Sequence, residues 1–178
     1  MAFKFKNADE FTRWNEEMTR KYDSEDYHLR SNFFIRWIER RRVNKIVEFI
    51  NAAPTDTVVE IGCGAGVVLE KFRADRLIGI DLSGYILQKA KSRLANRKAD
   101  VLQANAEILP LPNKTFQKLV CTEVMEHVVE PGNVVKELSR IATSDATIVI
   151  TIPNENLIDT LKQVLKKFGL SNLVLAGK

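Results

Sequence analysis

The stretch VVEIGCGAG (residues 58–66) decides the fold. Its first half is a short apolar run rich in β-branched residues, which predicts a buried strand. Its second half holds three glycines, which permit a tight turn and let a ligand approach the backbone closely. This turn either cradles a ligand or only joins the strand to the helical pattern that follows at 67–72.

The same alternation continues along the chain. Strands are expected at 77–80, 101–104, 118–121 and 147–151, and helices at 86–94, 134–141 and 157–168. Strands that alternate with helices require crossover connections, and these produce a parallel sheet covered on both faces. We therefore predict an α/β fold, with an open, doubly wound, mostly parallel sheet whose ligand lies at the carboxyl ends of the strands.

The first 53 residues differ in character from the rest. Apolar side chains recur at helical spacing, as in Phe11, Trp14 and Met18, and Pro54 stops the helical pattern. We expect an N-terminal helical cap segment at 1–53 and a ligand-binding core at 54–178, which together form one compact domain.

Composition restricts the class of protein. Apolar residues make up 45% and charged residues 28%, and the net charge is +4. No apolar run reaches the ~18 residues of a membrane span, and the N-terminus has no apolar signal core. Cys63 and Cys121 do not have the spacing of a disulfide framework. We expect a cytoplasmic protein without membrane insertion; its oligomeric state is not indicated.

A basic cluster lies in the N-terminal segment, at Arg36, Arg40–Arg42 and Lys45. Such a cluster is either a solvated helix face or a contact surface for nucleic acid.

The glycine turn departs from two common nucleotide-binding motifs. A nicotinamide-binding turn needs a glycine at position 67, which is Val67, and a P-loop needs a Gly-Lys-Ser or Gly-Lys-Thr ending, which is lacking. Glu60 would repel a pyrophosphate and suits a ligand with an ammonium group. Asp81 ends the second strand and either accepts from ribose hydroxyls or caps the next helix.

These strand ends resemble the class I S-adenosylmethionine-dependent methyltransferases, particularly the group of quinone-biosynthesis and other small-molecule enzymes. The matching stretches are VVEIGCGAG (58–66), LIGIDLS (77–83), ANAEILPLPNKTFQKLVCTEVMEHV (104–128) and IVITIPN (148–154). The resemblance covers roughly residues 55 to 155 and implies a Rossmann-like methyltransferase fold with S-adenosylmethionine as cofactor.

The resemblance also assigns cofactor contacts. Asp81 would hold the ribose, Leu82 would lie against the adenine, and Asn105 with Ala106 would meet the adenine edge, unless that segment is an ordinary turn. The residues near the methionine part would be Glu60, Gly62, Cys63, Gly64, Gly66, Thr122 and Glu123.

Four departures from the family pattern stand out. Asn105 and Gln117 occupy positions where aspartate is usual, and no glycine precedes the fifth strand, where Ser144–Ala146 stand instead. The family fold also continues through two further strands, whereas this sequence ends at Lys178, with Leu173–Leu175 as a candidate sixth strand. A truncated piece of a longer chain and a shortened protein would both explain this.

The implied reaction is methyl transfer to an unidentified, small-molecule acceptor. His127 is the candidate general base, because its usual pKa suits proton removal near neutrality, or else it is a packing residue. Glu123, Glu126 and His127 also resemble a metal site, but one short of a full ligand shell, so no metal is assigned. The resemblance implies that aromatic side chains of the N-terminal segment cover the pocket, whereas their helical spacing is more typical of core residues. These side chains are Tyr22, Tyr27, Phe33, Phe34 and Trp37.

Two other functions remain open at this point. An RNA or protein methyltransferase would use the basic cluster, and a non-catalytic module would bind the cofactor without transferring its methyl group.

Overall fold

The computed structural model describes residues 8–21 and 33–152. The helix expected at 157–168 and the strand expected at 173–175 lie outside these ranges. The described elements are α1 (Ala8–Lys21), α3 (Phe33–Ile50), β1 (Thr57–Ile61), η1 (Leu69–Lys71), β2 (Arg76–Asp81), α4 (Gly84–Arg93), β3 (Ala99–Gln103), β4 (Phe116–Thr122), α5 (Pro131–Ile141) and β5 (Ala142–Thr151).

Five strands form one parallel sheet in the order β3-β2-β1-β4-β5. Ile61 at the end of β1 pairs with Ile80 of β2 on one side and Cys121 of β4 on the other. The chain order reverses between β1 and β4, and parallel sheets open a crevice at such a point, beyond the carboxyl ends of the strands. The predicted fold class is confirmed.

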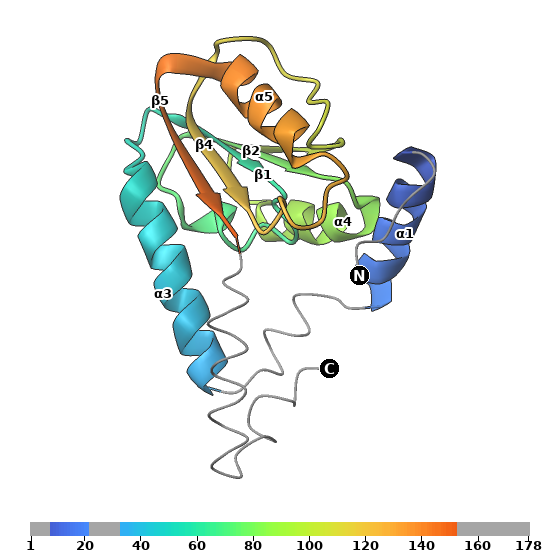
Figure 1. The fold of residues 1–178 in the computed structure, drawn as a ribbon. Helices are drawn as coiled ribbons and strands as arrows, with labels where there is room; N and C mark the ends of the chain where they lie inside the picture. The colour runs from blue at the N-terminus through green and yellow to red at the C-terminus, as the bar shows by residue number, and fades with distance from the viewer. Residues whose placement is uncertain (1–7, 22–32, 153–178) are drawn as a thin grey trace, which may run out of the picture.

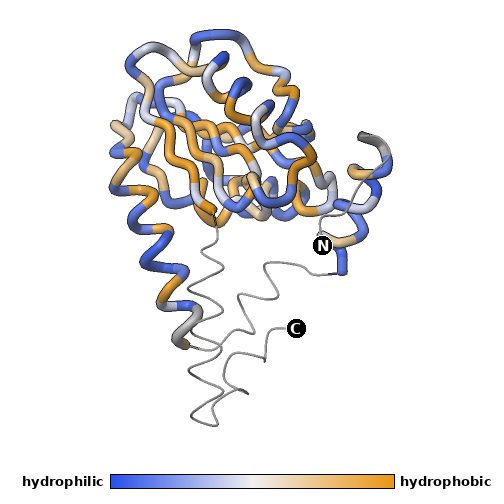
Figure 2. The backbone as a smooth tube through the Cα atoms, viewed as in Figure 1, coloured by the Kyte–Doolittle hydropathy of each residue, from blue (hydrophilic) through white to orange (hydrophobic). Residues whose placement is uncertain are grey.

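Helices cover both faces of this sheet (Figure 1). Val43, Ile46 and Ile50 of α3 belong to one buried cluster, together with Val58 of β1. Val59, the next residue of β1, belongs to the cluster formed with α5. Successive strand residues point to opposite faces, so both faces of an apolar strand are buried. Figure 2 shows these strands as the most continuously hydrophobic part of the chain.

Local signals explain where the helices begin and end. Ser83 caps α4, because its hydroxyl accepts from the Ile86 amide at 3.4 Å. Pro131 occupies the first turn of α5, where its missing amide hydrogen costs nothing. α3 ends at Ile50, followed by Asn51 at φ +44° and then Pro54.

Two elements differ from the sequence expectation. The helix expected at 67–72 is only the three-residue turn η1, whose first residue, Leu69, is fully buried. The preceding pair Val67–Val68 is β-branched and the segment is short, and both features disfavour an α-helix. β5 begins five residues early, because Ala142 already pairs with Phe116 beside an irregularity in β4.

Within 8–21 and 33–152, no helix combines the length and the apolar character that crossing a bilayer requires.

Candidate active site

The glycine turn follows β1 directly and has the left-handed conformation that glycine favours. Gly62, Gly64 and Gly66 have φ values of +74°, +50° and +76°. The amides of Gly62 and Cys63 both donate to the carbonyl of Ile80, at 2.7 and 2.9 Å, which holds the turn against β2. A Cβ at Gly62 would collide with Val124, whereas a Cβ at Gly64 would meet nothing within 4 Å. The turn therefore presents the backbone of Gly64 to open space.

Asp81 connects the glycine turn to the start of α4. Its carboxylate accepts from the Gly64 amide through Oδ2 and from the Ser83 amide through Oδ1, each at 2.9 Å. Burial raises its pKa above the usual value, although these backbone donors act in the opposite direction. The helix cap itself is Ser83, so Asp81 does not serve as the capping residue.

One cavity of about 220 Å³ opens beside these two residues. Its walls come from the ends of β1 and β2, from the segments that directly follow β3 and β4, and from α1 and α4. It brings together eight of the residues that the sequence assigned to the site. They are Gly62, Gly64, Asp81, Leu82, Asn105, Ala106, Glu123 and His127.

Four other assigned residues, Glu60, Cys63, Gly66 and Thr122, are not among the residues that line the cavity. Cys63 is buried behind the turn, where burial raises the pKa of its thiol, and Gly66 packs against Leu94 of the segment after α4. These two residues shape the turn from behind.

Glu60 and Thr122 form a buried pair beneath the turn. The hydroxyl of Thr122 donates to Glu60 Oε1 at 3.1 Å, and Glu60 is 1% exposed. Among the described residues, Glu60 Oε2 has no hydrogen-bond partner. Burial raises the pKa of Glu60 to about 8, and the hydrogen bond from Thr122 and the charge of Arg42 only partly oppose this.

Glu123 is held in a strained conformation at the end of β4. Its φ is +54°, which is unusual for a residue other than glycine. Its amide donates to the Thr151 carbonyl at 3.2 Å, and its Oε1 accepts from the Thr151 hydroxyl at 3.1 Å. Arg42 Nη1 of α3 lies 3.1 Å from the same oxygen. Sequence reasoning placed Arg42 in the basic cluster and did not predict that Arg42 and Thr151 contact Glu123, because no local pattern links positions so far apart.

Asn105 forms a turn with its own backbone neighbours. Its Oδ1 accepts from the Glu107 amide at 2.8 Å, the arrangement of an Asx turn. The ordinary-turn alternative therefore describes its conformation, yet the residue also lines the cavity. An amide oxygen has two lone pairs, so one acceptor position remains for a ligand.

His127 lies at the mouth of the cavity, with a side chain that is 61% exposed. Its Nε2 is 3.9 Å from Glu126 Oε1, and burial raises the pKa of that carboxyl. In the part of the chain that the structure describes, no three His, Cys, Asp or Glu side chains are placed to share a metal ion.

Helix α1 belongs to the N-terminal segment expected over the pocket, and it forms a wall of the cavity through residues that sequence reasoning did not assign to the site. Phe11, Asn15 and Thr19 line it, and Phe11 is 2% exposed. Asn15 Oδ1 is buried without a hydrogen-bond partner among the described residues. The i, i+4 spacing of these three residues was visible in the sequence, but two of them are polar and so did not stand out.

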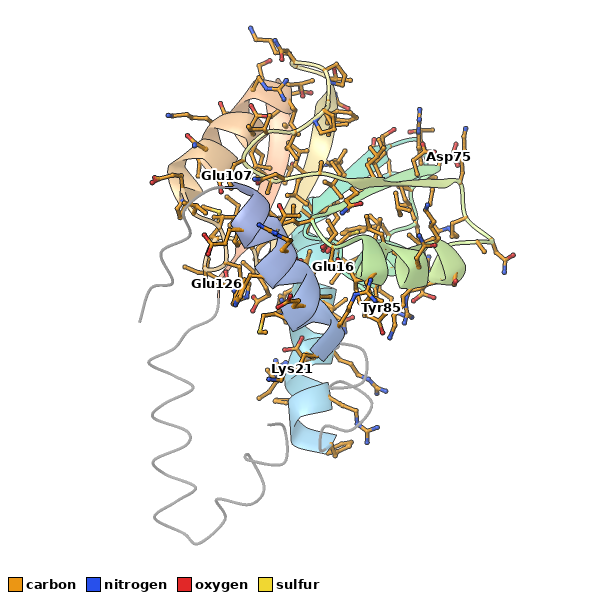
Figure 3. The ribbon with its side chains drawn as sticks, turned by 90° about the vertical axis from the view of Figure 1, so that its right-hand side faces the viewer. Glu16, Lys21, Asp75, Tyr85, Glu107 and Glu126 are labelled. Atoms are coloured by element: carbon orange, nitrogen blue, oxygen red, sulfur yellow. The ribbon has the colours of Figure 1, made fainter. Side chains whose placement is uncertain are left out.

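Side-chain contacts attach α1 to α4. The Ser83 hydroxyl donates to Glu16 Oε2 at 2.6 Å, and the Arg20 guanidinium lies 5.1 Å from the Tyr85 ring centre. Figure 3 shows α1 lying across this end of the molecule, with Glu16 on the side of Tyr85.

Two of the five aromatic residues expected in the core or over the pocket lie elsewhere. Phe33 and Trp37 are 76% and 44% exposed and do not line the cavity, so the core expectation is wrong for both. Tyr22 and Tyr27 lie outside the described residues, as does the side chain of Phe34.

Known proteins share both the sequence pattern and this architecture. A family profile described as "Methyltransferase domain" matches residues 59–150. A ubiquinone biosynthesis O-methyltransferase of Nitrosomonas europaea is 31% identical over 65% of this chain and 51% of its own length. The uncharacterized protein MJ1252 of Methanocaldococcus jannaschii is 27% identical over 88% of this chain and 56% of its own. The chain thus spans about half the length of these relatives.

A solved structure of a SAM-dependent methyltransferase from Thermotoga maritima has the same fold. It aligns with a TM-score of 0.61 at 20% identity and covers 88% of this chain and 71% of its own. The profile covers more than half of the sequence and includes the ends of β1, β2, β3 and β4 that form the cavity. The chain therefore belongs to the methyltransferase-domain family, in the class that uses S-adenosylmethionine.

Proposed function

We propose that this chain transfers a methyl group from S-adenosylmethionine to a small-molecule acceptor. One observation carries the proposal: Gly64 and Asp81, at the tips of adjoining strands, are hydrogen-bonded to each other and line the same cavity. Asp81 would accept from the ribose hydroxyls, and Asn105 with Ala106 would face the adenine. The methionine part would lie along Gly62 toward Glu123.

The charged groups near Glu123 suit the zwitterionic end of the cofactor. Arg42 Nη1 is buried and makes no hydrogen bond of good geometry among the described residues, although it lies 3.1 Å from Glu123 Oε1. The Glu123 carboxylate lines the cavity and would attract the ammonium group. Arg42 does not line the cavity, and its guanidinium would hold that carboxylate in place from behind.

The chemistry needs positioning more than it needs a strong catalytic group. An acceptor lone pair forms a bond to the methyl carbon while the carbon–sulfur bond breaks, and the bonding electrons return to sulfur. Alignment of the reacting atoms supplies ~7–11 kcal/mol in favourable cases. His127, at the cavity mouth, would take the proton of a hydroxyl acceptor, a contribution of roughly 10²–10⁴-fold.

The name of the Nitrosomonas relative, a ubiquinone biosynthesis O-methyltransferase, supports an oxygen atom as the methyl acceptor. A comparison of methyl acceptors separates a small-molecule methyltransferase from an RNA or protein methyltransferase and from a non-catalytic module. The full chain is incubated with S-adenosylmethionine labelled in its methyl group and, separately, with a catechol, with RNA and with a protein extract. We expect label in the catechol product. Label only in RNA or protein would identify a macromolecular acceptor, and binding without any product would indicate a non-catalytic module.

A further inference from the structure

A second cavity lies between α3 and the segment that follows the glycine turn. We call it the cationic groove; its volume is about 420 Å³. It shares no lining residue with the active-site cavity. Its lining residues on α3 are Arg36, Glu39, Arg40, Arg42, Val43 and Asn44, and those opposite are Val67, Val68, Lys71 and Arg93.

The arginine and lysine side chains that line the groove outnumber its carboxylates, so the groove has a net positive charge. Arg42 pairs with Glu39 at 2.8 Å, and Arg93 lies 3.3 Å from Glu70. Lys71 is 3.6 Å from that same Glu70, which therefore serves two cations.

Arg36 and Arg40 have no carboxylate partner within the described ranges, and they stand one helical turn apart. Two adjacent guanidinium groups form a suitable donor set for a phosphate.

The base of the groove is apolar. Val43 and Val68 are 9% and 7% exposed, and Val67 is half-buried. A purely ionic ligand would leave these valine side chains without an apolar contact. A ligand with a hydrocarbon part beside its anionic group would cover it, at a gain of ~0.8 kcal/mol for each buried methylene.

A smaller hollow of about 210 Å³ adjoins the groove and shares Arg36 and Arg40 with it. Its other walls are Phe33, which is largely exposed, and Trp37, which is less than half exposed. In Figure 1 the N-terminal half of α3, which carries these residues, extends past the edge of the sheet. The two arginines therefore lie between two apolar hollows, an arrangement that matches an anionic head with an attached chain.

We propose that the cationic groove binds a free phosphate monoester that carries an alkyl chain. Its phosphate would lie between Arg36 and Arg40, and its chain would cover the valine base. This site shares no lining residue with the cofactor cavity, although Arg42 of the groove contacts Glu123 of that cavity. Its ligand need not be a substrate of methyl transfer.

The test measures binding of inorganic phosphate, hexyl phosphate and decyl phosphate to the full chain by calorimetry, with the alkyl phosphates kept monomeric. Affinity should rise with chain length, with decyl phosphate at least about tenfold tighter than inorganic phosphate. The double variant Arg36→Gln/Arg40→Gln should lose at least about tenfold in affinity for decyl phosphate. The matched control is Lys114→Gln/Lys136→Gln, which removes the same charge from exposed positions outside the groove.

The thermal unfolding midpoint of each variant checks that it folds. Arg36 and Arg40 are exposed, so their replacement should not shift this midpoint. Equal loss in the control pair, or unchanged binding by the groove variant, would overturn the proposal. So would binding only to vesicles of anionic phospholipid, or binding of single-stranded RNA that decyl phosphate does not displace.

Discussion

Gly62 is the most constrained residue of the site. It combines a positive φ with contact to Val124, whose β-branched side chain has little freedom to move away. Gly62→Ala should lower the free energy of unfolding by roughly 2–3 kcal/mol, from backbone strain and overpacking together. Denaturant unfolding measures the change.

The matched control is Gly132→Ala in the first turn of α5, where an added Cβ would meet nothing within 4 Å. That substitution should be neutral or slightly stabilising, since alanine favours helix. Equal losses for the two variants would contradict the tight fit assigned to Gly62.

The buried carboxyl of Glu60 should make stability depend on pH. Its pKa in the folded chain is about 8, against 4.5 for the ordinary group, so the folded state favours the protonated form. The stabilising contribution is complete below the ordinary pKa and is lost as pH rises through the folded value. Glu60→Gln should remove this dependence, which amounts to roughly 3–5 kcal/mol between about pH 5 and about pH 9.

Denaturant unfolding at the two pH values checks this, with the exposed Glu48→Gln as control. A parent chain that is as stable at the higher pH as at the lower one would contradict a buried, protonated Glu60.

At the level of single residues, the sequence predicts those site residues whose position depends on the neighbouring sequence alone. Gly64 and Asp81 could be predicted because Asp81 ends a recognisable strand and Gly64 lies in the glycine turn just after another. Arg42, Thr151 and Asn15 could not, because their contacts depend on how α3, β5 and α1 pack against the sheet.

Among the elements, α1 is joined to the start of α4 by a side-chain hydrogen bond that can be tested directly. The hydrogen bond from Ser83 to Glu16 joins it to the start of α4, and Ser83 is fully buried. A double-mutant cycle with Glu16→Gln and Ser83→Ala should give a coupling free energy of about 1 kcal/mol in unfolding. Ser83→Ala also breaks the capping hydrogen bond from the Ile86 amide to the Ser83 hydroxyl, and the cycle subtracts the free-energy cost of that loss.

Glu17→Gln is the control for this cycle, because Glu17 is an exposed neighbour on the same helix. We expect no coupling between Glu17 and Ser83. Additive effects of the Glu16 and Ser83 substitutions would mean that α1 is held by other contacts.

The strands could be predicted more completely than the helices. Buried parallel strands are continuous apolar runs, so β1 and β2 are recognised with little ambiguity. η1 was expected to be longer, since its apolar spacing fits a helix although its β-branched start does not. The exposure of Phe33 and Trp37 could not be foreseen, because helical spacing alone does not say what the helix packs against.

For the whole molecule, the strand order explains why residues from distant parts of the sequence share one cavity. The carboxyl ends of β1, β2, β3 and β4 meet at one edge of the sheet, and the reversal between β1 and β4 leaves a crevice there. α3 and α5 cover opposite faces, which leaves this edge to α1 and α4. The cationic groove lies on the α3 side, so the two cavities can be tested by separate variants.

The most direct test of the account is calorimetric titration of S-adenosylhomocysteine into the full chain and into Asp81→Asn. The parent should bind at a single site. The variant should bind at least about tenfold more weakly, because an amide replaces one of the two acceptor oxygens and its NH₂ faces a backbone donor. Asp75→Asn, an exposed substitution, should bind as the parent does. No binding by the parent, or equal binding by Asp81→Asn, would contradict the adenosyl site at these strand ends.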